Sequence, residues 1–252
     1  MLHRVRSGRA GAPRVVLVHG FTQTHRSWDE VAAALDDRFE VVRVELPGHG
    51  GSADETLDFV EAAAAIGEAG GPATYVGYSM GGRLCLRLAL DRPDLVGSLV
   101  LVGASPGIAD EDARDERRRS DALLATDLEG GDTKTFLQAW LAQPMFETTK
   151  PRPDELAARR ANSAEGLAYA LRALGTGSQD PLWDRLPELA MPVLLVVGEH
   201  DAKFLGIAAG MVNGGAPART EVVEGAGHAV LLDRPGECAD LIAGAARHAA
   251  TR

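Results

Sequence analysis

The chain has 252 residues, of which 45% are hydrophobic and 25% charged, so one α/β domain with a sizeable core is possible. The formal net charge is −10. That charge argues against nucleic acid as a partner, because binding phosphate requires a basic face.

The cysteines and the apolar stretches indicate the compartment. Cys85 and Cys238 are the only cysteines, which is too few for a disulfide framework and fits a reducing environment. The first twenty residues lack the apolar core of a signal peptide. No apolar stretch approaches the roughly 18 residues that are needed to span a bilayer. We therefore expect a cytoplasmic protein without a membrane partner, either a monomer or a small homo-oligomer.

Short apolar runs rich in β-branched residues alternate with helical patterns along the chain. Strands are predicted at residues 14–20, 40–46, 73–78, 98–104 and 192–199, with a shorter candidate at 219–225 and a possible edge strand at 2–6. Helices are predicted at 26–36, 56–69, 80–91 and 235–249. Continuously apolar strands are typical of a sheet buried on both faces, so the pattern predicts a doubly wound, mostly parallel α/β sheet.

Residues 105–186 break this alternation. They contain no convincing strand, but helical patterns occur at 109–128, 132–142, 153–161 and 164–175. We interpret the block as a helical cap over the carboxyl ends of the strands, where open α/β sheets bind ligands. The expected organisation is a core of residues 1–104 and 187–252 with the cap 105–186 inserted into it, all within one structural unit.

The sequence Gly77-Tyr78-Ser79-Met80-Gly81 follows a predicted strand and begins a predicted helix. This is the setting of a nucleophile elbow, in which a strained turn presents a serine above the sheet and the flanking residues have to be small. In such folds an acid and then a histidine follow the serine along the chain. Asp201 comes at the end of a predicted strand, and His228 lies on a glycine-flanked loop before the last helix. Glu199 is an alternative acid and His200 an alternative base.

Two backbone amides are candidates for an oxyanion hole. Phe21 follows the predicted strand 14–20, and Met80 comes directly after the serine. In this kind of fold, amides at these two places bind the negative charge that develops on oxygen. His19 and the turn 46–52 are expected to brace the neighbouring loops.

Arg83 follows Ser79 by four residues and so lies on the same face of the predicted helix. A cation in a first helical turn opposes the helix dipole, at a cost of roughly 0.3–1 kcal/mol. A carboxylate bound beside the helix N-terminus would offset that cost. The alternative is a solvated surface arginine, which the composition favours because only three of the 26 basic residues are lysine.

The predicted cap supplies further groups of this kind. Arginines occur at 117–119 and at 159–160, and Trp140 and Phe146 could line an apolar pocket. Taken together with Arg83, they favour a small, anionic and partly apolar substrate. No metal-ligand motif and no dinucleotide fingerprint is present, so we expect neither a metal nor a cofactor.

Several segments carry a resemblance to one family. They are HGFTQTHRSWDEV, LPGHGGS, VGYSMGGR, ERRRSD, QAWLAQPMF, RRANS, GEHDAKF and GAGH. The chain resembles the α/β-hydrolase-fold synthases of 2-succinyl-6-hydroxy-2,4-cyclohexadiene-1-carboxylate (SHCHC) in menaquinone biosynthesis, over about residues 15–240. The cap segments are the specific part, because the elbow and the triad alone would indicate only the α/β-hydrolase fold. Glu45 stands where the family usually has an aspartate.

The resemblance implies a lyase that expels pyruvate from a succinylated, enolpyruvyl-bearing cyclohexene carboxylate. Ser79 would act as a base on carbon and pass its proton to His228, which Asp201 would orient, and no acyl-enzyme would form. The alternative function is an α/β-hydrolase that acts on carboxylic esters or on C–C bonds of ring-fission products. A non-catalytic binding protein on this fold is a third possibility, against which the complete set of three residues argues.

The resemblance also implies which side chains contact the substrate. The carboxylate-binding residues would be Arg83, Arg117 and Arg160, and the residues lining the site would be Tyr78, Trp140 and Phe146. Arg119 is an alternative to Arg117, and Arg159 is an alternative to Arg160, because in both places arginines lie close together in the sequence.

Overall fold

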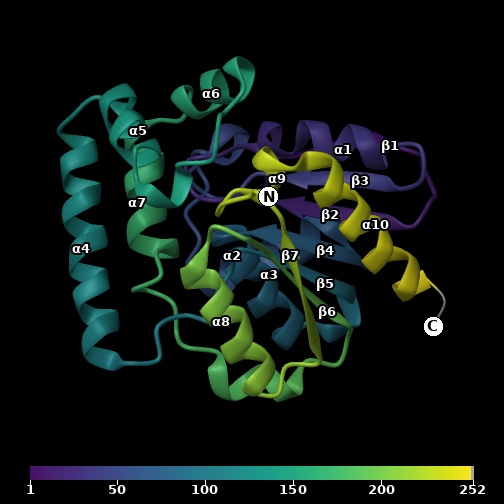
Figure 1. Ribbon diagram of the computed structural model, residues 1–252. Coiled ribbons are helices and arrows are strands. Elements are labelled where there is room, and N and C mark those ends of the chain that lie inside the picture. Colours follow the sequence, from purple (N-terminus) through teal and green to yellow (C-terminus); the bar gives the residue numbers. More distant parts are fainter. Residues whose placement is uncertain (251–252) are drawn as a thin grey trace.

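A seven-stranded sheet in the order β1-β3-β2-β4-β5-β6-β7 forms the centre of the protein (Figure 1). The structure is a computed structural model and describes residues 1–250. The strands are β1 (Arg4–Gly8), β2 (Arg14–Val18), β3 (Glu40–Val44), β4 (Ala73–Tyr78), β5 (Val96–Val102), β6 (Val193–Gly198) and β7 (Ala218–Val223). Only β1 is antiparallel to its neighbour, β3. The predicted doubly wound, mostly parallel sheet with its edge strand is confirmed.

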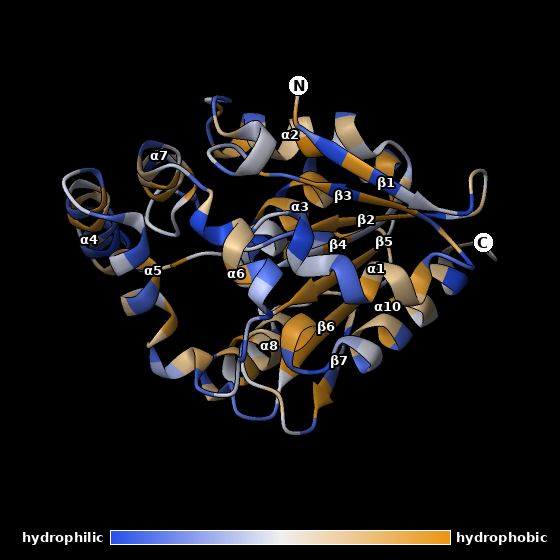
Figure 2. Ribbon diagram, turned by 90° about the horizontal axis from the view of Figure 1, so that it is seen from above, coloured by the Kyte–Doolittle hydropathy of each residue, from blue (hydrophilic) through white to orange (hydrophobic). Residues whose placement is uncertain are grey.

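Helices cover both faces of this sheet. One face carries α2 (Phe59–Gly70), α3 (Met80–Asp91) and α8 (Ala202–Asn213), and the other carries α1 (Asp29–Leu35) and α10 (Pro235–Ala250). Along β2, Val16 and Val18 pack with the first group of helices, whereas Val15 and Leu17 pack with the second. Successive side chains of a strand point to opposite faces, which is why these strands are apolar throughout. Figure 2 shows the hydrophobic strands enclosed between the helices.

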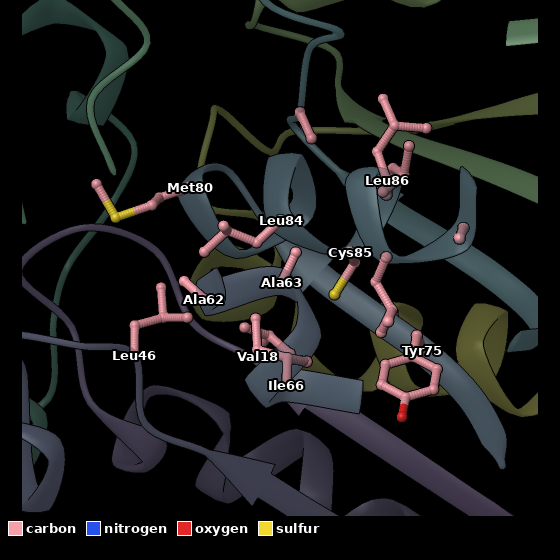
Figure 3. Packing of buried hydrophobic residues seen from close by; sticks show 14 of the residues in the cluster. Val18, Leu46, Ala62, Ala63, Ile66, Tyr75, Met80, Leu84, Cys85 and Leu86 are labelled. Atoms are coloured by element: carbon pink, nitrogen blue, oxygen red, sulfur yellow. The ribbon is translucent and has the colours of Figure 1, made fainter. Parts of the chain in front are cut away.

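The packing of α2 and α3 on the sheet fixes the place where α3 begins. Ala62 and Ile66 of α2 lie against Leu84 and Cys85 of α3, and all four are buried (Figure 3). Burying a leucine or isoleucine side chain contributes about 1.5–3 kcal/mol. The first residues of α3 therefore rest on a close-packed layer rather than on a mobile loop.

Between β5 and β6 the chain forms four further helices, here called the inserted helices. They are α4 (Glu111–Glu129), α5 (Thr133–Leu141), α6 (Pro153–Arg160) and α7 (Ala164–Leu174). They lie beside the sheet, on the left of Figure 1, with α4 packed along α7. Asp110, Asp132 and Ser163 each accept a hydrogen bond from a first-turn amide, which marks where α4, α5 and α7 begin.

The remaining elements are short. They are α9 (Val230–Asp233) and the 3₁₀ turns η1 (His25–Trp28), η2 (Gly50–Ser52), η3 (Pro93–Leu95), η4 (Pro144–Phe146) and η5 (Trp183–Glu188). Among residues 1–250, no helix combines the length and the apolar character needed to cross a bilayer.

Candidate active site

Ser79 occupies the sharp turn between β4 and α3, with φ 50° and ψ −109°. A non-glycine residue in this left-handed region carries strain of about 1–3 kcal/mol. The flanking glycines are required by close packing. A Cβ on Gly77 would lie 2.5 Å from the carbonyl oxygen of Gly81, and one on Gly81 would lie 2.5 Å from that of His19. The turn therefore has the strand–turn–helix geometry of the elbow that the sequence predicts.

His228 and Asp201 reach Ser79 from two other loops at the carboxyl edge of the sheet. His228 Nε2 lies 3.2 Å from Ser79 Oγ, and His228 Nδ1 lies 2.7 Å from Asp201 Oδ2. An ionised carboxylate only accepts hydrogen bonds, so Nδ1 carries the proton and Nε2 offers its lone pair to the serine hydroxyl. Such an arrangement can remove the proton of the hydroxyl group.

Asp201 is held in place because it also begins α8. Its second carboxylate oxygen accepts the Phe204 amide at 3.3 Å, which is an N-cap bond. The alternative residues lie apart from Ser79: Glu199 accepts the Gly225 amide at 2.9 Å, and His200 is exposed. The structure therefore brings Asp201 and His228 together with the serine, and it does not bring Glu199 or His200 there.

Aromatic rings surround the imidazole of His228. Its ring centroid lies 5.2 Å from that of Tyr78, 6.0 Å from that of Phe146 and 4.6 Å from that of Phe204. Gly103, with φ 54°, lies directly behind it, and a Cβ there would come within 2.9 Å of the imidazole. The ring is thus confined and only 1% exposed, which fixes the direction of Nε2.

The loop that carries Phe21 is braced by two buried histidines. His19 Nε2 accepts the Leu46 amide at 3.1 Å, and His49 Nε2 accepts the Thr22 amide at 3.2 Å. A ring nitrogen that accepts a hydrogen bond carries no proton, so both imidazoles are neutral. Burial, reinforced by the proximity of the two rings, lowers the pKa of His19 to about 3, and burial lowers the pKa of His49 to about 4.

The amides of Phe21 and Met80 are free to bind an oxyanion. Both residues line the cavity that contains Ser79. Within residues 1–250, neither amide has a hydrogen-bond acceptor. Thr22, with φ 67°, sets the backbone direction next to Phe21. Two unpaired donors beside a serine are the arrangement that stabilises developing negative charge.

The cavity has a volume of about 670 Å³ and adjoins both the sheet and the inserted helices. Its lining includes Tyr78, Trp140 and Phe146, as the sequence predicts. The Trp140 ring packs edge-on against Phe21, with centroids 5.1 Å apart. Trp140 Nε1 is buried without a hydrogen-bond partner, so this donor is available to a ligand.

Arg83 reaches the cavity from the first turn of α3 and is buried rather than solvated. Its guanidinium donates to Gln179 Oε1 at 2.9 Å and to the Leu174 carbonyl at 2.7 Å. Both acceptors are neutral. Burial, and then the charge of Arg117, lowers the pKa of Arg83 to about 9, while Asp121 opposes that change. The side chain stays charged at neutral pH, and no carboxylate within residues 1–250 binds it directly.

Arg117, on α4, also lines the cavity, and its Nε donates to Asp121 Oδ1 at 2.8 Å. Arg119 is exposed and does not line the cavity. Two residues along a helix differ in direction by about 200°, so only one of the two can face the cavity. The structure thus places Arg117, and not Arg119, at the site.

The structure does not bring Arg160 to the cavity. Arg160 is exposed and is not among the residues that line the cavity. Its neighbour Arg159 is buried, with Nε 2.5 Å from Glu155 Oε1 and Nη1 2.8 Å from Thr22 Oγ1. The Arg159–Glu155 pair packs α6 onto the loop that carries Phe21, and this packing turns Arg160 toward solvent. Neither arginine lines the cavity.

Sequence reasoning missed other residues of the cavity. Lys203, on α8, adds a third cation to its lining, and Phe136 lies stacked with Trp140 at 6.1 Å. Both could have been found. Lys203 is two residues beyond the predicted acid Asp201, and Phe136 precedes Trp140 by four residues, which places both rings on one helix face.

Comparison with known proteins places the chain in a family. The model of the alpha/beta hydrolase family matches residues 15–241. A putative 2-succinyl-6-hydroxy-2,4-cyclohexadiene-1-carboxylate synthase from Bacillus subtilis is 32% identical over 90% of this chain and 88% of its own. The synthase of that name from Enterobacter sp. is 31% identical over 95% of this chain and 94% of its own. The structure of MenH from S. aureus has a TM-score of 0.89 and 29% identity, and the match covers 99% of both chains. The chain belongs to the SHCHC synthase family within the α/β hydrolases.

Proposed function

We propose that the protein eliminates pyruvate from a succinylated, enolpyruvyl-bearing cyclohexene carboxylate and so forms SHCHC for menaquinone biosynthesis. The observation that carries this proposal is the set of cations around one cavity. Arg83, Arg117 and Lys203 line the cavity that also contains Ser79 and His228. The expected substrate has three carboxylates. A hydrolase for neutral esters would have no use for these cations.

Of the three cations, Arg83 gives the strongest support for an anionic substrate. Among the described residues, the acceptors of this buried guanidinium, Gln179 and Leu174, are neutral, and Asp121 acts on its charge only from a distance. A substrate carboxylate would complete its electrostatic environment with a charge-assisted hydrogen bond. Lys203 adds a third cation to the lining, while Asp121, which also lines the cavity, pairs with Arg117.

The proposed reaction begins with proton transfer from carbon. Ser79 Oγ removes a proton from the ring carbon next to the succinyl carbonyl, while its own proton passes to His228 Nε2. The electrons of the C–H bond form an enolate, whose oxygen accepts hydrogen bonds from the Phe21 and Met80 amides. Asp201 holds the imidazole in the required tautomer and stabilises the imidazolium that forms.

The second step breaks a carbon–oxygen bond. The electron pair moves through the ring double bond and expels the enolpyruvyl oxygen, which leaves a cyclohexadiene. The departing enolpyruvate takes the proton of the His228 imidazolium and tautomerises to pyruvate. Ser79 already carries the proton taken from carbon, so both residues return to their starting protonation states. No bond forms between Ser79 and the substrate, so no ester intermediate has to be hydrolysed.

The inserted helices would complete the site as a cap. They supply Arg117, Trp140 and Phe146 to a cavity whose reacting groups come from the sheet. Aromatic rings there would exclude water from the enolate, which strengthens the hydrogen bonds that stabilise it. The proposed division is therefore a core of residues 1–104 and 187–252 with a cap at 105–186.

An ester or C–C hydrolase is the alternative, because the same three residues could attack a carbonyl. Pyruvate release from the succinylated enolpyruvyl substrate is measured beside hydrolysis of a p-nitrophenyl ester, with the wild-type chain and with Ser79→Ala. Pyruvate formation that disappears in the variant, together with slow ester cleavage, supports the lyase. Fast ester cleavage without pyruvate would refute it.

A further inference from the structure

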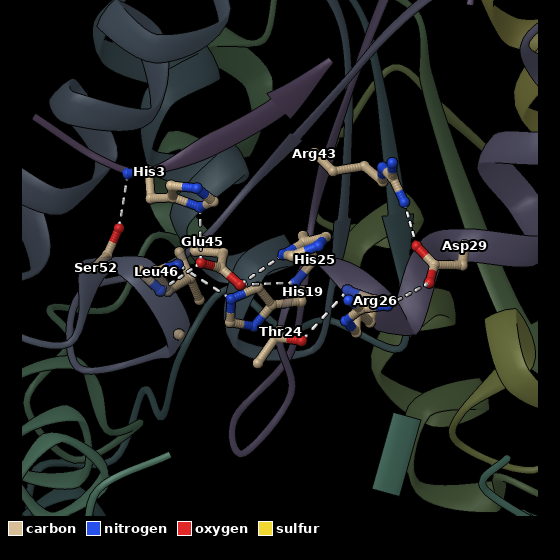
Figure 4. Close-up of polar contacts among 12 residues, drawn as sticks. His3, His19, Thr24, His25, Arg26, Asp29, Arg43, Glu45, Leu46 and Ser52 are labelled. Atoms are coloured by element: carbon tan, nitrogen blue, oxygen red, sulfur yellow. Dashed lines mark hydrogen bonds and ion pairs between the residues drawn. The ribbon is translucent and has the colours of Figure 1, made fainter. Parts of the chain in front are cut away.

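Three side chains that the proposed reaction does not use meet at one edge of the sheet. His3 precedes β1, His25 begins the turn after β2, and Glu45 follows β3. His3 Nδ1 lies 2.8 Å from Glu45 Oε2, and His25 Nδ1 lies 2.7 Å from Glu45 Oε1 (Figure 4). One ligand atom from each residue lies within 4.8 Å of the others. None of the three lines the catalytic cavity.

The surroundings hold the carboxylate of Glu45 rigidly at the centre of this group. Its side chain is 3% exposed, and Oε2 also accepts the Gly51 amide at 2.5 Å. Gly50 and Gly51 pack so closely that a Cβ on Gly50 would collide with the carboxylate, and one on Gly51 would lie 2.7 Å from the His3 ring. The Ser52 hydroxyl accepts the His3 amide at 2.8 Å. The His3 side chain is 44% exposed, so solvent reaches the group.

Two imidazoles and one carboxylate form a ligand set for a first-row transition metal. Zn²⁺ binds histidine nitrogen and carboxylate oxygen at about 2.0–2.2 Å, which in a tetrahedral site puts ligand atoms about 3.3 Å apart. The two nitrogen–oxygen distances of 2.7 and 2.8 Å would have to open slightly, which requires small rotations of both His25 and His3, whose side chains are 20% and 44% exposed. Ca²⁺ and Mg²⁺ prefer oxygen ligands only, so the two imidazoles select against them.

We propose that His3, His25 and Glu45 bind one divalent transition-metal ion, with Zn²⁺ the best fit, at a structural site separate from the catalytic cavity. Each ring coordinates through Nδ1 and keeps its proton on Nε2, and water occupies the exposed fourth position. The ion would join three segments that are distant in sequence: the start of the chain, the loop that follows Phe21, and the turn after β3. An ion that binds only the folded state stabilises it, so the site would act as a clamp at this edge.

Binding is tested with the untagged, full-length chain after treatment with a chelator. Equilibrium dialysis measures bound Zn²⁺ for the wild type, for His3→Gln and for the double variant His3→Gln/His25→Gln. His200→Gln is the matched control, because His200 is an exposed histidine of another loop. We expect one equivalent of Zn²⁺ in the wild type and in the control, and affinity at least tenfold lower in His3→Gln.

Two further measurements keep the test independent of folding defects. Co²⁺ titration gives visible absorption bands when the ion is bound by nitrogen and oxygen in tetrahedral geometry, and these bands should be missing from His3→Gln. Added Zn²⁺ should raise the Tm of the wild type and leave that of His3→Gln unchanged. If the wild type binds no more Zn²⁺ than the double variant, or if His3→Gln binds it equally well, the site does not exist.

Discussion

Replacing Arg83 with methionine should show whether this side chain serves substrate binding or the stability of the fold. Methionine fills most of the same space but has no charge and no donor. The substitution leaves Gln179 Oε1 and the Leu174 carbonyl without their donors. Each acceptor left unpaired costs about 1–3 kcal/mol. Against this, the variant no longer buries a cation that lacks an ionic partner, and the lowered pKa of Arg83, about 9, reflects that penalty.

The two contributions nearly offset one another in the free enzyme. We therefore expect the free energy of unfolding to change by less than about 2 kcal/mol, because both acceptors can bind water in the vacated space. Catalysis has no such compensation. Losing the charge that holds a substrate carboxylate beside Ser79 should cost about 2–5 kcal/mol of transition-state stabilisation, or roughly 30- to 5000-fold in kcat/KM.

Pyruvate release, coupled to oxidation of NADH by lactate dehydrogenase, gives kcat/KM, and urea unfolding gives the stability. Arg87→Met is the control, because Arg87 lies one turn further along α3, pairs with Asp91 and does not line the cavity. The control should retain kcat/KM within about threefold. A decrease of less than tenfold in Arg83→Met would show that Arg83 does not bind the substrate. A loss of more than about 4 kcal/mol in stability would make its role structural instead.

Arg117→Gln should lower kcat/KM at least tenfold, whereas Arg119→Gln on the same helix should leave it unchanged; equal effects in the pyruvate assay would contradict the assignment of Arg117 to the site. Gly81→Ala should lower the free energy of unfolding by about 1–3 kcal/mol or more, because its Cβ would lie 2.5 Å from backbone atoms. A lower Tm and a lower soluble yield would report this loss. The lowered pKa values of His19 and His49, about 3 and about 4, mean that the unfolded chain takes up protons below pH 6.5 while the folded chain does not. Stability should therefore fall with decreasing pH from about 6.5, by about 1.4 kcal/mol per pH unit for each ring. Urea midpoints that stay constant between pH 7 and 5 would contradict this.

The strands and the elbow could be predicted because each depends on a local pattern. Residues 15–18 and 75–78 are buried and so read as continuous apolar runs. Asp201 and His228 follow from topology, since the carboxyl ends of parallel strands meet at one edge. The sequence does not predict helix α8, because Gly206 and Gly210 weaken its helical pattern. The N-cap hydrogen bond of Asp201 that begins this helix is visible only in the structure.

The adjacent arginines could not be separated from sequence alone. The direction of a residue on a helix depends on which face packs, and packing is a tertiary property. For Arg159 a signal was available: Glu155 precedes it by four residues, the spacing of a helical ion pair, and the structure forms that pair. Paired in this way, Arg159 is anchored on α6, and its neighbour Arg160 cannot face the same direction. The proposed metal site at His3, His25 and Glu45 has no spacing signature, because its members come from three separate segments.

The net charge of the chain is negative, and so is the charge of the proposed substrate. The two are compatible because an anion in the cavity lies close to cations and far from most surface carboxylates. The chain carries −10, yet Arg83, Arg117 and Lys203 line its cavity. At physiological ionic strength, charges on the surface are screened over about 8 Å. Charges inside a partly apolar cavity act through a lower effective dielectric and are screened far less. We therefore expect the net negative charge to disfavour polyanions such as nucleic acids, which need a broad basic face. The small tricarboxylate proposed as the substrate would respond instead to the three cations that line the cavity.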